Sequence, residues 1–107
     1  MTRIDGNTPL LDDPAMRAIG FTDHREGYWY WCRGIMPGVT LNFTINKETG
    51  DYSELVMDEM FGQPYFYGAT TFEEKIVTAV DAMLADLNAH GLTLAVDHSL
   101  YGGANAS

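Results

Sequence analysis

Five carboxylic acids fall between residues 48 and 59, at Glu48, Asp51, Glu54, Asp58 and Glu59. On a strand, Glu54 and Asp58 would point to the same side, because side chains alternate with a period of two. Two such carboxylates could transfer protons or bind a cation. The segment lacks the Asp-x-Asp-x-Asp-Gly spacing of a calcium loop, and charged side chains commonly protect strands from aggregation. We therefore interpret the cluster as a solvated strand surface.

The remaining candidates for chemistry are three histidines and one cysteine: His24, His90, His98 and Cys32. The histidines do not have the paired spacing of zinc ligands. Cys32 is expected to be buried, and a buried thiol is usually inert. Gly-rich phosphate loops, serine nucleophile motifs and dinucleotide fingerprints are missing from the sequence. The sequence therefore predicts no catalytic residue, no metal site and no cofactor, and it favours a non-enzymatic protein.

Four aromatic residues follow one another in "GYWYWCRG", at positions 28–31. A strand over 28–35 would divide this stretch into two sets, Tyr28, Tyr30 and Cys32 on one side and Trp29, Trp31 and Arg33 on the other. Cysteine is among the most buried residue types and arginine is rarely buried. We therefore expect the first set to face the core and the second set to face away.

The outward tryptophans need a cover, because large exposed apolar patches are rare on monomers. The N-terminal helix or the aromatic loop at 61–67 could fold over them, a second copy could pair there, or another protein or a small ligand could bind. In that loop, Phe61 and Phe66 are expected to pack and Tyr65 or Tyr67 to stay partly exposed. The resulting prediction is a partner-binding surface composed of Trp29, Trp31, Arg33, Glu54, Asp58, Tyr65 and Tyr67.

The clearest structural signal is the hairpin at 39–58. Its first arm alternates apolar residues from Val39 to Ile45 with polar ones, which is typical of a strand with one dry face. Gly50 suits the turn. Pairing Lys47 with Asp51 would place Phe43 opposite Leu55 and Leu41 opposite Met57, so that both return-strand residues lie on the dry face.

Helices flank this hairpin. "LLDDPAMRAIGF" predicts a short N-terminal helix with Asp12 or Asp13 as the cap, Pro14 in the first turn and Gly20 at the stop. Residues 72–90 predict one long helix, capped by Thr71. Residues 92–97 predict a short last strand. The expected fold is an α+β domain over 1–107, with an antiparallel sheet of three to four strands and the long helix on one face; residues 1–9 and 101–107 are expected to be loose.

The charge is strongly acidic, at −9 for 107 residues. Residues 40–107 hold ten acids and two lysines, a net charge of −8. Such a surface repels nucleic acid and anionic membranes and attracts basic proteins. An acidic balance also serves solubility. The sequence lacks a signal-peptide pattern and an apolar run long enough for a membrane helix, so a cytoplasmic protein is expected.

These features favour an interaction protein that binds a protein partner or itself through the aromatic and acidic sheet face. A sharper version is an inhibitor that mimics nucleic acid and blocks a basic groove. The alternative is a small-molecule-binding domain or enzyme with a pocket between helix and sheet, formed by Tyr28, Tyr30 and the 61–67 loop. A purely structural accessory subunit is a third hypothesis.

Overall fold

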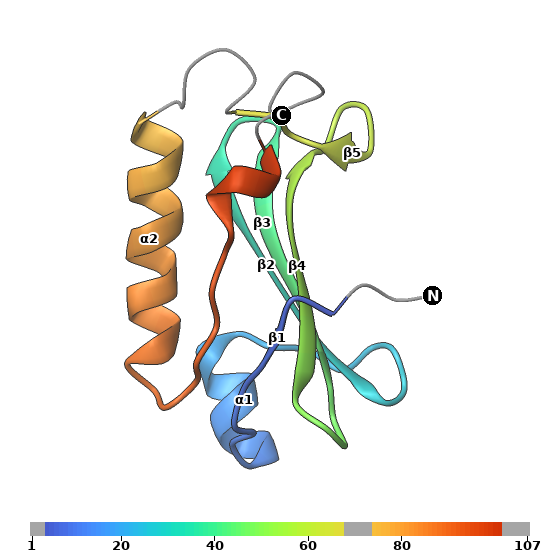
Figure 1. The fold of residues 1–107 in the computed structure, drawn as a ribbon. Helices are drawn as coiled ribbons and strands as arrows, with labels where there is room; N and C mark the ends of the chain where they lie inside the picture. The colour runs from blue at the N-terminus through green and yellow to red at the C-terminus, as the bar shows by residue number, and fades with distance from the viewer. Residues whose placement is uncertain (1–3, 68–73, 102–107) are drawn as a thin grey trace.

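The computed structural model describes residues 4–67 and 74–101. The elements along the chain are β1 (Gly6–Asn7), α1 (Asp13–Ile19), β2 (Tyr28–Met36), β3 (Val39–Asn46), β4 (Asp51–Asp58), β5 (Gln63–Pro64), α2 (Glu74–Asn88) and the 3-10 turn η1 (His98–Tyr101). The strands form one antiparallel sheet in the order β1-β4-β3-β2, with β5 beside the far end of β4. The α+β prediction is confirmed, with α2 lying along one face of the sheet (Figure 1).

The short helix α1 forms where its capping signals lie. The Asp12 side chain accepts a hydrogen bond from the backbone N–H of Ala15, and proline stands in the first turn. Gly20 ends the helix in the left-handed conformation, with φ of 114°. Met16 points from this helix into the core. The predicted cap of α2 at Thr71 lies outside the described residues.

The predicted register of the β3–β4 hairpin is wrong by one residue. Phe43 pairs with Glu54 and Leu41 with Val56. The turn therefore spans four residues, and its conformation is fixed by the Asn46 side chain, which accepts hydrogen bonds from the backbone N–H groups of Glu48 and Thr49. As a result Leu55 and Met57 lie on the face opposite the core.

The predicted orientation of β2 is also wrong. Trp29 and Trp31 are each only 2% exposed and pack in the same core as Leu41 and Val80. Cys32, expected inside, is exposed. Arg33 points to the core side of the sheet and stays partly exposed, because it lies at the edge with its guanidinium 5.0 Å from the centroid of the Trp31 ring.

Cationic side chains complete the cover of the tryptophans. Arg17 from α1 and Lys47 from the hairpin both lie over the Trp29 ring, at 5.2 and 4.2 Å from its centroid. Phe21 and Phe43 pack against Trp31 from two sides. The indole rings are therefore sealed by α1, α2 and the neighbouring strand.

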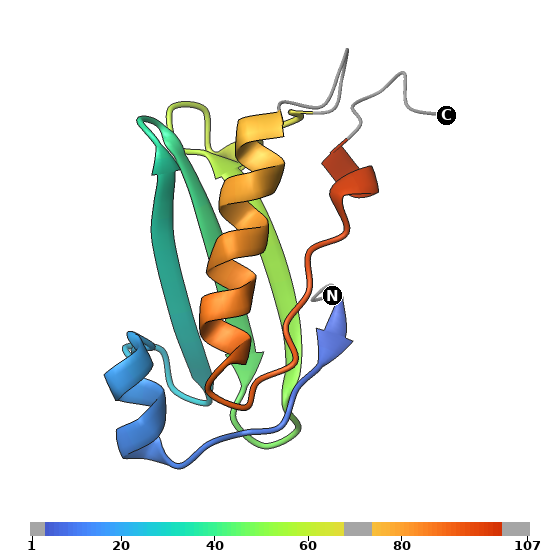
Figure 2. The same ribbon diagram turned by 90° about the vertical axis from the view of Figure 1, so that its left-hand side faces the viewer.

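The segment from Leu92 to Asp97 does not form the predicted strand. It runs as an extended chain beside α2, on the side of β4 and β1 (Figure 2), with Leu92 and Leu94 buried. Side chains hold its backbone in place of a strand partner: the Asn88 side chain bonds both the N–H and the C=O of Leu94, and the Tyr52 hydroxyl accepts from the N–H of Ala95.

The two chain ends are more ordered than predicted. Gly6 and Asn7 pair with β4 as β1, and Thr8 is buried, so residues 4–9 are not loose. Tyr101 is 1% exposed and belongs to η1, whereas 102–107 lie outside the described residues. In the loop at 61–67, the expected packing of Phe61 and Phe66 is wrong, because both are exposed. Of the two tyrosines, Tyr65 stays partly exposed as expected and Tyr67 is buried.

Candidate functional site

The sheet face opposite α2 is the main candidate surface, and we call it the open face. It consists of Tyr28, Tyr30, Cys32, Thr40, Asn42, Thr44, Ser53, Leu55 and Met57. In the part of the chain that the structure describes, both α-helices and the 92–101 segment lie on the other side (Figure 1). The registers of the three strands place these residues in rows, such as Cys32 beside Asn42 beside Leu55.

A chain of polar contacts crosses the open face. The Tyr30 hydroxyl donates to Asn42 Oδ1 at 2.6 Å, and Asn42 Nδ2 donates to Thr40 Oγ1 at 3.0 Å. The Thr40 hydroxyl in turn donates to Glu59 Oε1 at 2.6 Å. Burial, followed by the nearby Cys32, raises the pKa of Tyr30. These bonds fix the side chains, so the open face presents a preorganised polar stripe beside Leu55 and Met57.

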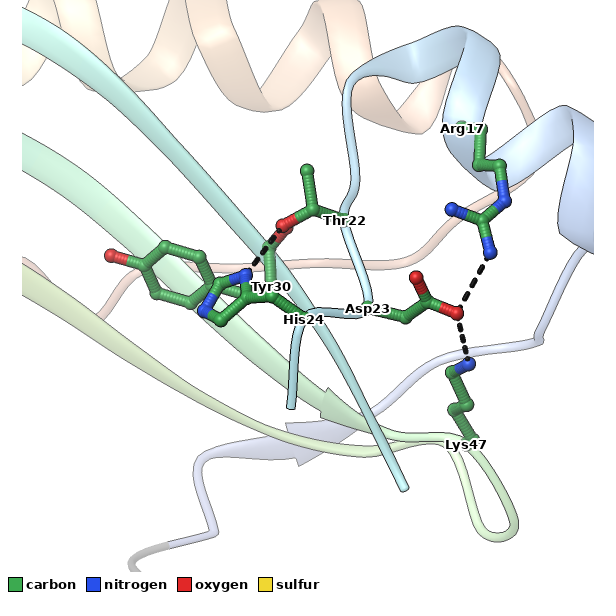
Figure 3. A network of polar contacts seen from close by, with 6 residues as sticks. All are labelled: Arg17, Thr22, Asp23, His24, Tyr30 and Lys47. Carbon is green, nitrogen blue, oxygen red and sulfur yellow. Dashed lines mark hydrogen bonds and ion pairs between the residues drawn. The ribbon is translucent and has the colours of Figure 1, made fainter. Parts of the chain in front are cut away.

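The 20–27 loop borders this face and is held by a charged bridge (Figure 3). Asp23 Oδ2 lies 2.7 Å from Arg17 Nη2 and 2.9 Å from Lys47 Nζ. These hydrogen bonds, with Arg17 contributing most, lower the pKa of Asp23 to about 2. Beyond the bridge, the His24 ring meets Tyr30 edge-on at 5.4 Å between centroids, and Thr22 bonds the His24 ring nitrogen.

The open face is nearly flat. Its larger hollow, of about 200 Å³, lies between Tyr30, Asn42 and Met57, and a second of about 90 Å³ lies near Tyr28 and Ile4. Both are smaller than the roughly 300–1,000 Å³ of typical small-molecule pockets. The prediction that Tyr28 and Tyr30 line a pocket between helix and sheet is wrong, because both lie on the face away from α2. Core side chains, including both tryptophans, fill the space under the helix, and a hollow of about 690 Å³ lies between α2 and the β2 edge.

A second cluster lies on the core side, where η1 meets the sheet. The Tyr101 hydroxyl donates to Glu54 Oε2 at 2.7 Å and accepts from the N–H of Val56 at 2.9 Å. Tyr67 stacks on Tyr101 with centroids 5.1 Å apart and bonds His98. Burial, then the charges of nearby carboxylates, raises the pKa of Tyr67.

This cluster resembles a catalytic relay, since His98 Nε2 also lies 3.0 Å from Asp81 Oδ1. However, Tyr67 and Tyr101 are only 2% and 1% exposed, so a substrate could not reach their hydroxyl groups. The contacts instead tie η1 to β4 and α2. Their role in this arrangement is to hold the C-terminal segment on the core.

The structure divides the predicted binding residues between several environments. Trp29, Trp31, Glu54 and Tyr67 are buried, so the predicted surface is wrong in composition. Among the remaining predicted members, Arg33 is exposed, whereas Asp58 and Tyr65 are half-buried. Glu54, Tyr65 and Tyr67 come together around Tyr101, and Arg33 joins Trp31 at the sheet edge.

Sequence reasoning missed the outward positions of Tyr28, Tyr30, Leu55 and Met57. The available signal was the tyrosine itself: its hydroxyl tolerates a half-exposed sheet face, whereas tryptophan carries more apolar surface to bury. Within residues 4–67 and 74–101, no group of three or more histidine, cysteine or acidic side chains is placed to hold a metal ion. Neither α-helix of these segments is long and apolar enough to cross a bilayer.

A protein of known structure shares this fold. The crystal structure of a DUF1831 family protein from Lactobacillus plantarum matches with a TM-score of 0.67, at 16% sequence identity, over 81% of this chain and 82% of that one. No protein-family model matches the chain, and no curated protein matches it significantly. At this level of identity the likeness establishes the fold, an α+β domain with one helix-covered sheet face.

Proposed function

We propose that this chain is a non-enzymatic interaction protein that binds a basic protein partner through its open face. The observation that carries the proposal is a sheet face that no helix of residues 4–67 and 74–101 covers, with two tyrosines, Leu55 and Met57 around a fixed polar stripe. Tyrosine and methionine are enriched where proteins bind one another. The partly exposed members of the stripe, Tyr30 and Thr40, supply hydroxyl groups that the buried Asn42 already orients.

The charge determines which partner chemistry fits. Asp51 begins β4, Glu59 directly follows its last residue, and the exposed Glu48 lies in the hairpin turn before it. With a net charge of −9, the chain attracts a basic surface and accelerates its association. A second copy is a poorer occupant of this face, because it brings another −9. A nucleic-acid-binding protein with a basic groove is the partner class that fits best.

Site-specific photocrosslinking tests the proposal. A photoreactive phenylalanine analogue replaces Leu55 on the open face, and a matched variant carries it at Ala18, an exposed position on α1. In extract of the native host, we expect a discrete adduct with a basic protein from position 55 and none from position 18. The yield should fall when salt rises from about 0.1 M to about 1 M, as the Debye length shortens from about 10 Å to about 3 Å.

Comparison of positions 55 and 18 also shows which results would contradict the proposal. Equal adducts from both positions would indicate non-specific capture. An acidic adduct, or a yield that does not change with salt, would contradict the charge argument. As a further control, Tyr30→Arg is combined with the photoreactive residue at position 55. The added positive charge repels a basic partner and should abolish the adduct, while the far-ultraviolet circular dichroism stays native.

A further inference from the structure

The outer edge of β2 carries backbone hydrogen-bonding groups that pair with no other strand of the described residues. Tyr30 exchanges two backbone hydrogen bonds of 2.8 Å with Thr22, on the side of β2 that faces away from β3. Residues of an antiparallel strand alternate between inward and outward bonding. Cys32 and Gly34 therefore also turn their N–H and C=O groups outward, and among the described strands none pairs with them there.

The free stretch is short and bounded at both ends. Thr22 occupies the edge at Tyr30, and the register of β2 shifts between Gly34 and Met36, which interrupts the regular edge. Cys32, Arg33 and Gly34 are all exposed. The backbone N–H and C=O groups of Cys32 and Gly34 therefore remain for hydrogen bonding to one further strand.

A groove of about 690 Å³ runs beside this edge, on the side covered by α2. It is lined by Arg33, Ala79, Ala82, Met83, Ala85, Asp86 and Ala89. Arg33 Nη1 lies 3.6 Å from Asp86 Oδ2 across the groove. The remaining lining is apolar and, apart from Met83, consists of alanines. The groove therefore offers room for a packed element but few polar groups to orient a small ligand.

We propose that this edge binds a second copy of the chain, with β2 pairing antiparallel to β2 about a twofold axis at Arg33. Cys32 of each copy then pairs with Gly34 of the other, which forms four backbone hydrogen bonds. This register uses both free residues of each strand. A register centred on Cys32 would require Tyr30, which already bonds Thr22.

Two further features fit a second copy better than a different partner. A twofold axis normal to the sheet places both α2 helices on the same face of the joined sheets. Their alanine-lined sides then meet across the junction between the two copies, which we call the seam. Small side chains permit such helices to approach at the short end of the usual 8–10 Å interaxial range. The groove also contains one basic residue, Arg33, and one acidic residue, Asp86, so Arg33 of each copy can form an ion pair with Asp86 of the other.

The dimer has a distinctive salt dependence. Its seam is short and each copy carries −9, so we expect a dissociation constant on the order of 10–100 µM at low salt. Screening weakens the repulsion between copies, so dimerisation should strengthen as salt rises. Binding of a basic partner to the open face should weaken over the same range. The two proposals therefore fail or succeed separately.

Sedimentation equilibrium at about 0.1 M and 1 M salt tests the inference with a matched pair of variants at one position. Gly34→Ala keeps the N–H, and its Cβ meets no atom within 4 Å. Gly34→Pro removes that N–H, which lies outside the β2–β3 ladder. We expect the parent and Gly34→Ala to approach twice the 11.9 kDa chain mass, and Gly34→Pro to weaken association at least about tenfold.

A second pair guards against misfolding of the proline variant. Ala82→Glu places a charge in the helix seam and should also yield monomers, whereas Ala18→Glu on α1 should not change the mass. Circular dichroism confirms that each variant keeps the fold. A monomeric parent at about 1 mM in both salts overturns the proposal, as does an unchanged mass in folded Gly34→Pro and Ala82→Glu.

The exposed Cys32 provides an independent measurement, because it is the only cysteine of the chain. In the proposed register the two Cys32 Cα atoms lie about 8 Å apart, from the strand rise and spacing. This distance exceeds the roughly 7 Å limit for a disulfide. A short bismaleimide should therefore link two copies, while mild oxidation should not. Failure of the bismaleimide to link copies at concentrations where the chain sediments as a dimer contradicts this register.

Discussion

The two faces of the sheet come from the same three strands and differ in almost every physical respect. The covered face holds Trp29, Trp31, Leu41, Phe43, Ile45 and Val56, each no more than 2% exposed. The open face holds tyrosine, amide, hydroxyl and sulfur side chains, many of them half-exposed. Successive side chains of β2 from Tyr28 to Arg33 point to opposite faces, so the face that one residue takes determines the face of the next. Turning the two tryptophans inward necessarily turns the cysteine and both tyrosines outward.

The difference between the faces shows which sequence rule prevailed. The rule that cysteine is buried and arginine exposed favoured the opposite orientation of β2. The far greater apolar area of two indole rings outweighs one thiol. Arg33 satisfies its own preference at the sheet edge, since its guanidinium lies over the Trp31 ring near Asp86 while the side chain stays 45% exposed.

The largest expected effect distinguishes adjacent residues on the two faces. Trp31→Ala removes a ring packed between Phe21 and Phe43, and we expect it to lower the free energy of unfolding by about 3–5 kcal/mol. Tyr30→Ala, one residue away on the open face, should cost no more than about 2 kcal/mol. Urea unfolding measures both. Equal losses would mean that the faces are not distinguished by burial.

An intermediate effect is expected at the buried carboxylate of the covered face. Tyr101→Phe removes the hydroxyl that serves both Glu54 and the N–H of Val56, which should cost about 1–3 kcal/mol. Leu100→Ala, at the exposed neighbouring position, should change stability by less than about 1 kcal/mol. Thermal unfolding of the two variants measures the difference. A stable Tyr101→Phe protein would show that η1 is held by packing alone.

The smallest effect concerns the bridge that borders both faces. Asp23 has a folded pKa of about 2 against its usual 3.8, because Arg17 and Lys47 bond its carboxylate. A lowered folded pKa stabilises the fold above about pH 4, and this contribution is lost as pH falls from about 4 towards 2. Asp23→Asn should therefore flatten this part of the acid unfolding curve. An unchanged curve would show that the bridge is broken in solution.

The fold class followed from local signals that agree with each other. The alternation at 39–45, the capping residues of α1 and the apolar arc of α2 predict elements that the structure contains within two residues at each described end. The register of the hairpin could not be decided by pattern. On β4, Tyr52, Glu54 and Val56 form one set and Ser53, Leu55 and Met57 the other, and each set contains two apolar residues.

What decides the register comes from distant parts of the chain. Glu54 tolerates burial because Tyr101, 47 positions later, donates a hydrogen bond to its carboxylate. Tyr52 is likewise engaged by the backbone of Ala95. The choice of Glu54 as a surface residue depended on this register, whereas the choice of Trp29 and Trp31 depended on the separate expectation that Cys32 is buried. Local reading predicted the elements, whereas long-range contacts determine which face of each strand is presented.

Hydroxyl-radical footprinting tests the central claim, the assignment of the two faces, within a single peptide that spans β2. Cys32, Tyr28 and Tyr30 should be oxidised in the native protein, while Trp29 and Trp31, intrinsically more reactive than tyrosine, should be protected until the chain unfolds. Oxidation of both tryptophans in the folded protein at rates matching Cys32 would contradict the assignment and remove the open face on which the proposed binding depends.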